Sequence, residues 1–135
     1  MDSVAYQKLL FRAAVGVMAS DGEVHDDEIQ ELELACKNTG FFSDISCEEE
    51  FKAALDELDA EGNSFVGRLI VDLGSAEMAP AQELQLLEVV LRIIYADGRI
   101  DDNELKFLEL LKKQLNIFKK LMEMKYSQKI YQIKL

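Results

Sequence analysis

The sequence predicts an all-α fold, a compact bundle of about six to seven helices with two pseudo-repeated hairpins of helix, Asp-Gly (DG) loop and helix. The first observation is that apolar residues recur every three to four positions along most of the chain, as in helices with one buried face. The second is that the 135 residues include one proline and 7 glycines, the residue types that interrupt helices. The third is a duplicated motif around the DG loops.

The first two helices are predicted from apolar stripes that end at turn signals. The stretch 4–20 is apolar at helical spacing and stops at Asp21-Gly22. A second helix is expected over 26–37. It stops at Asn38-Thr39-Gly40, where we expect Gly40 to close the helix in a left-handed conformation.

The next two helices are predicted from a cap and a break in the chain. Ser46 and Glu49 have the spacing of a capping box, in which each side chain accepts a hydrogen bond from the backbone of the other residue. The helix that follows has an apolar stripe and stops at Glu61-Gly62-Asn63. A fourth helix is expected over 65–74.

The last two helices are predicted to begin at a proline and after the second DG pair. Pro80 suits the start of a helix, because the first helical position needs no N–H donor, and a helix is expected over 81–96. After Asp97-Gly98 a sixth helix is expected over 102–115. The positions that we expect these two helices to bury are Leu84, Leu87, Leu91, Ile94, Leu105, Leu108, Leu111 and Leu115.

Charge divides the chain into an acidic body and a basic tail. The net charge is −11, yet residues 116–135 hold five lysines against one glutamate, so they carry +4 and the first 115 residues carry −15. We predict a helical domain over 1–118 and a basic tail or terminal helix extension over 119–135. The acidic body argues against a nucleic-acid partner, because phosphates favour basic surfaces. A protein partner remains a candidate, and dimer formation through exposed apolar residues stays open.

The DG loops belong to an internal repeat. VMASDGEVHDDEIQELELA (17–35) and IIYADGRIDDNELKFLELL (93–111) align at an offset of 76 with seven identities over 19 positions. Each copy is one helical hairpin. The duplicated acidic residues are Asp21, Asp26 and Glu28 in the first copy and Asp97, Asp102 and Glu104 in the second.

A calcium loop of the EF-hand kind is excluded by two positions in each copy. With Asp97 at loop position 5, Gly98 fits position 6 and Glu104 fits position 12. Positions 1 and 3 then fall on Ile93 and Tyr95, where carboxylates would be needed. The first copy has Val17 and Ala19 at the same positions.

Two interpretations of the DG loops remain open. In the first, Gly98 ends a helix with positive φ, Asp101 and Glu104 form a capping box, and Ile100 packs as a hydrophobic staple. His25 stands at the capping position in the first copy. In the second interpretation the two loops come together, and their duplicated carboxylates share one divalent cation. Oxygen ligands favour Ca²⁺, Mg²⁺ or Mn²⁺.

The segments VMASDGEVHDDE and IIYADGRIDDNE carry a family resemblance. Each has the pattern (A/S)-D-G-x-(V/I)-x-x-x-E between apolar helices. This pattern resembles the TerB-like domain, a family that includes the tellurite-resistance protein TerB and the N-terminal region of the co-chaperone DjlA. The resemblance covers residues 4–118 and implies an all-helical fold, a link to tellurite or general stress resistance, and an acidic surface proposed to bind metal. The family's acidic positions match Asp21, Glu28, Asp97 and Glu104.

The remaining residues favour a non-catalytic role. His25 is the one histidine, no serine or cysteine is spaced to partner it, and no phosphate-binding glycine loop or CxxC motif occurs. No catalytic or organic-cofactor residues are therefore predicted. The first hypothesis is a cytoplasmic TerB-like module that binds a divalent cation and serves tellurite resistance or a stress response. The alternative is a metal-free protein–protein interaction scaffold that uses the acidic face and the basic tail.

The same hypothesis places the chain in a reducing compartment. Cys36 and Cys47 are expected to be free thiols in the cytosol. No apolar run reaches the length of a bilayer span, and the N-terminus lacks the pattern of a signal peptide.

Overall fold

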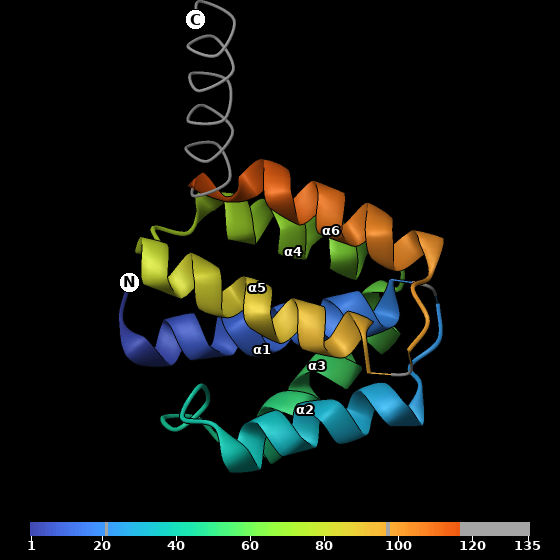
Figure 1. Ribbon diagram of the computed structural model, residues 1–135, viewed down its shortest axis with the longest axis horizontal. Coiled ribbons are helices and arrows are strands. Elements are labelled where there is room, and N and C mark those ends of the chain that lie inside the picture. Colours follow the sequence, from blue (N-terminus) through green and yellow to red (C-terminus); the bar gives the residue numbers. More distant parts are fainter. Residues whose placement is uncertain (21, 97, 117–135) are drawn as a thin grey trace, which may run out of the picture.

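The computed structural model describes residues 1–20, 22–96 and 98–116, most of which lie in six α-helices (Figure 1). The all-α bundle predicted from the sequence is confirmed for this part of the chain. The predicted boundary at residue 118 and the basic tail over 119–135 lie outside the described residues. The helices are α1 (Ser3–Ala19), α2 (Asp26–Asn38), α3 (Cys47–Glu61), α4 (Ser64–Ser75), α5 (Pro80–Ile94) and α6 (Asp102–Gln114).

Two helices run side by side through the middle of the bundle. α1 packs against α5 and points in the same direction, with α4 and α6 on one side of the pair and α2 and α3 on the other (Figure 1). From Leu9 to Met18, every α1 residue is buried except Arg12, which is half-buried. A helix that is apolar on all sides must be surrounded by other elements, and α1 is therefore the centre of the core.

The two hairpins pack in a reciprocal way. The second helix of the first hairpin, α2, lies against the first helix of the other, α5. The second helix of the other hairpin, α6, lies against α1. Between them in sequence, α3 and α4 pack against each other and against α1. The repeat seen in the sequence is thus also a repeat of packing partners.

Gly16 permits the close approach of α4 and α6 to α1. A Cβ atom at this position would overlap the side chain of Leu69 and lie 3.3 Å from the ring of Phe107. Both of these side chains are buried, so neither can turn away into solvent. Glycine in a helix costs about 1 kcal/mol relative to alanine, and this packing offsets that cost.

Arg12 is a charged residue on the otherwise apolar α1. Its guanidinium lies 3.1 Å from an Asp72 carboxylate oxygen and 3.4 Å from one of Glu57. It also lies over the ring of Phe65, 5.7 Å from the ring centroid. Arg12 therefore joins α1 to α3 and α4 by charge as well as by contact.

Several local predictions are wrong. Leu84 and Leu105 are 52% and 43% exposed, and Ile100, the expected staple residue, is 45% exposed. α5 and α6 carry apolar residues on more than one face, so their periodicity did not identify the face that meets the core. Gly40 does not have a positive φ, because α2 closes at Thr39 in an extended conformation. The apolar residues that α5 and α6 bury are Leu86, Val89, Val90, Ile93, Ile94, Phe107 and Leu111.

Candidate functional site

The two DG loops lie at the same end of the bundle, because α1 and α5 run in parallel and each leads into one of them (Figure 1). The positive φ predicted at Gly98 is confirmed at 74°, and Gly22 repeats it at 87°. The N–H of Gly22 donates to the carbonyl of Ala19 at 3.0 Å, and that of Gly98 donates to the carbonyl of Tyr95 at 3.2 Å. We call this end of the molecule, with residues 20–25 and 96–101, the DG end.

Two of the predicted site residues, Asp21 and Asp97, lie outside the described residues. The other four lie at the starts of α2 and α6. Asp26 and Asp102 occupy the first helical position and are exposed. Glu28 and Glu104 are buried, with 3% and 6% of their surface exposed.

The two buried glutamates cap their own helices. Oε1 of Glu28 accepts a hydrogen bond from the backbone N–H of His25 at 3.2 Å. Oε1 of Glu104 accepts one from the backbone N–H of Asp101 at 3.3 Å. Each glutamate thus sits at the third helical position, the place where a capping box needs it. The capping interpretation is confirmed for these two side chains.

The residue that precedes each helix differs between the copies. Oδ1 of Asp101 accepts from the backbone N–H of Asn103 at 2.6 Å. His25 holds the equivalent position in the first copy, with an imidazole in place of a carboxylate. Over residues 1–20, 22–96 and 98–116, no group of three or more His, Cys, Asp or Glu side chains is arranged to hold a metal ion. That search does not include Asp21 or Asp97.

Sequence reasoning missed a third buried glutamate, Glu83, in the first turn of α5. It is 3% exposed, and its Oε1 accepts from the backbone N–H of Asn116 at 3.0 Å. The contact holds the chain just beyond α6 against the start of α5. An acidic residue in the first turn is common in helices, so the sequence offered no signal that this one would be buried.

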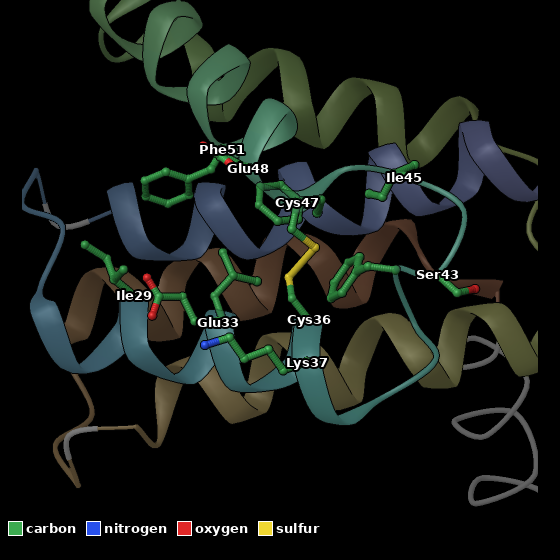
Figure 2. Close-up of a pocket in the computed structure, with 12 residues that line it drawn as sticks. Ile29, Glu33, Cys36, Lys37, Ser43, Ile45, Cys47, Glu48 and Phe51 are labelled. Atoms are coloured by element: carbon green, nitrogen blue, oxygen red, sulfur yellow. A yellow bond between two sulfur atoms is a disulfide. The ribbon is translucent and has the colours of Figure 1, made fainter.

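A cavity of about 710 Å³ lies among α1, α2, α3 and the loop that joins α2 to α3 (Figure 2). Its wall includes a disulfide between Cys36 and Cys47.

The expectation of free thiols is therefore wrong. The α2–α3 loop turns the chain back so that the two Cα atoms are 6.6 Å apart, which is within bridging range. The sequence signal that could have predicted the bridge is the position of the two cysteines on either side of a predicted turn.

The family follows from a match over most of the chain. A family model described as "Tellurite resistance protein TerB" matches residues 7–123. The chain belongs to the TerB family. The TerB match spans both DG loops and all of α2 to α6, and it confirms the resemblance carried by the two motifs.

The assignment to the TerB family rests on this family model. No curated protein and no solved structure matches it. In the described part of this TerB-family protein, no helix is long and apolar enough to cross a membrane.

Proposed function

We propose that this TerB-family chain is a non-catalytic cytoplasmic module that binds a divalent cation at the DG end, in support of tellurite resistance or a general stress response. One observation carries the proposal. The parallel packing of α1 and α5 brings two duplicated acidic loops to one end of the bundle. Two loops at opposite ends could not have shared an ion.

The chemistry of the duplicated residues supports a hard cation. Carboxylates are oxygen ligands, which suit Ca²⁺, Mg²⁺ or Mn²⁺ better than Zn²⁺. Capping holds the carboxyl groups of Glu28 and Glu104 beside the DG end. The proposed ligands are drawn from Asp21, Asp26, Glu28, Asp97, Asp102 and Glu104.

A titration of the full chain tests this proposal. We expect saturable binding of Ca²⁺, Mg²⁺ or Mn²⁺ by calorimetry, and amide shifts confined to the DG end with the diamagnetic ions. Asp97→Asn should abolish both responses. Glu49→Gln is the matched control, because it also removes one negative charge but lies near the bridged, distant end of α2, about 18 Å along the helix from Asp26. Absence of any response at millimolar ion concentrations would contradict the proposal.

A metal-free interaction scaffold is the second candidate. Capping explains Glu28 and Glu104 without an ion, and it leaves Asp26 and Asp102 exposed beside them. An exposed acidic face of this kind suits a basic protein partner. We would titrate a lysine-rich peptide at low and high salt. Salt-sensitive shifts at Asp26 and Asp102 in a protein that ignores all the cations would favour the scaffold, and no binding even at low salt would contradict it.

A further inference from the structure

The Cys36–Cys47 bridge lies in the wall of the cavity. Cys36 lies in the last turn of α2, and Cys47 is the first residue of α3. Both are half-buried and packed on the edge of the core. Both also line the 710 Å³ cavity, where Figure 2 shows the bridge between Ile29 and Phe51 on one side and Ile45 on the other. The bridge therefore borders the cavity on one side and the core on the other.

The two cysteines differ in how well they leave as thiolates. Cys47 is at the start of α3, where Ser46 is the cap and its Oγ accepts from the N–H of Glu49 at 3.3 Å. The partial positive charge of a helix start stabilises a thiolate. Cys36 lies at the opposite, partly negative end of α2. The carboxylates of Glu48 and Glu49 would disfavour a thiolate at Cys47. Both are exposed, so solvent screens their charges.

The bridge also ties together two helices that are anchored on different neighbours. α2 packs on α5, whereas α3 packs on α1 and α4. α2 buries two apolar residues, Leu32 and Ala35, in the core. The loop between α2 and α3 is tied to α1 at its far side, where the N–H of Asp44 donates to Oε1 of Gln7 at 2.7 Å. Loss of the bridge would thus free the end of α2 while the start of α3 stays in place.

We propose that Cys36–Cys47 is a thiol–disulfide exchange site that an external dithiol reduces across the cavity, and that this reduction releases the end of α2 from α3. A thiolate of the dithiol attacks Sγ of Cys36, the S–S bond breaks, and Cys47 leaves as a thiolate that takes a proton from solvent. The second thiol of the dithiol then attacks the mixed disulfide. Cys36 leaves and is protonated, so two electrons pass from the dithiol to the pair.

The test uses the folded, oxidised full chain and dithiothreitol as the dithiol. Samples are taken at timed intervals and freed of dithiothreitol before maleimide is added, because the reductant also reacts with maleimide. We expect two labels per chain at completion, because the sequence has two cysteines, and a rate of reduction that rises in proportion to dithiothreitol. Helix content by circular dichroism should stay constant. A dye that binds apolar surface should become more fluorescent as the cavity opens, and amide exchange should become about tenfold faster in the last turns of α2 but not in α6.

The variant Cys36→Ser/Cys47→Ser is the control. It should match the reduced protein in dye fluorescence and amide exchange and should ignore dithiothreitol. Labelling that appears only after denaturant is added would show a structural bridge and overturn the exchange site. Equal dye fluorescence and exchange in the two redox states would overturn the release of α2. Neither outcome depends on cation binding at the DG end.

Discussion

α2 and α6 hold equivalent places in the two hairpins, but they are held in different ways. α6 buries Phe107 and Leu111 in the core. α2 buries the smaller set Leu32 and Ala35, and a disulfide ties its last turn to α3. The two helices begin alike, since a buried glutamate caps each of them.

The difference shows that the repeat preserved the helix starts and the helices that pack together, but not the side chains that hold α2 and α6 in place. At the offset of 76, Phe107 corresponds to Glu31, and Cys36 corresponds to Lys112. The second hairpin is therefore fixed mainly by apolar burial and the first partly by a covalent bond. α2 is the helix that a change in redox conditions can loosen, and α6 is not.

The largest expected effect is that of Phe107→Ala. The ring is buried and lies beside Gly16, so its loss should lower the free energy of unfolding by about 3–5 kcal/mol. Leu32→Ala is the counterpart in α2. It should fall near the lower end of about 2–5 kcal/mol, because Leu32 already borders the cavity. Urea unfolding measures both free energies. A larger loss of stability in Leu32→Ala than in Phe107→Ala would contradict the conclusion that α6 depends more on apolar burial than α2 does.

Removal of the bridge should have the next largest effect. Cys36→Ala/Cys47→Ala should lower the free energy of unfolding by about 3 kcal/mol, because the cysteines are 11 residues apart and the bridge closes a short loop in the unfolded chain. Urea unfolding under non-reducing conditions gives the value. Unchanged stability relative to the oxidised parent would show that packing alone holds α2.

Tyr6→Phe tests the contact between the hairpins. The Tyr6 hydroxyl lies 2.6 Å from Oε1 of Gln85 and 2.9 Å from the carbonyl oxygen of Gln82, and its single proton serves one of them at a time. Its loss should cost about 1 kcal/mol of unfolding free energy. The variant should keep the bundle intact, as judged by circular dichroism.

The same residue predicts a dependence on alkaline pH. Burial raises the pKa of the Tyr6 hydroxyl above its ordinary value of 10.0. The unfolded chain then loses this proton first, so the contribution to stability is complete below pH 10 and declines as the pH rises above it. Urea unfolding between pH 9 and pH 11 should show a steeper loss in the parent than in Tyr6→Phe. Parallel losses would assign the effect to other groups.

The smallest effects are expected at the two caps. Asp101→Ala should cost about 1 kcal/mol of unfolding free energy, since it removes the acceptor for the N–H of Asn103. His25→Asp would make the first cap resemble the second and should raise stability by up to about 1 kcal/mol. Thermal unfolding of both variants measures the difference. A stabilising Asp101→Ala would show that the capping carboxylate is kept for another purpose.

Local signals predicted the helices well. The predicted cap at Ser46 is present, with its Oγ accepting from the N–H of Glu49. α2 and α6 begin within the predicted motifs, because caps and DG turns act between residues close in sequence. The exposed Leu84 and Leu105 show the limit of such signals. Where a helix is apolar on more than one face, its neighbours decide which face is buried.

The candidate site was predictable in its residue types but not in its arrangement. The duplicated carboxylates and the capping role of Glu104 could be read from their spacing. The burial of Glu83 could not, because its partner Asn116 is 33 residues away. The pairing of Cys36 with Cys47 depends likewise on how the α2–α3 loop turns.

The sequence by itself determined the helical class, the helix starts and the family, because these follow from the order of neighbouring residues. Only the tertiary structure decided that α1 and α5 run in parallel and bring both DG loops to one end. It also decided that α6 is held by packing, and α2 by a smaller buried set together with a bridge. The physical reason is that both outcomes depend on contacts between segments far apart in the chain. The free energy of such contacts cannot be inferred from the pattern of neighbouring residues.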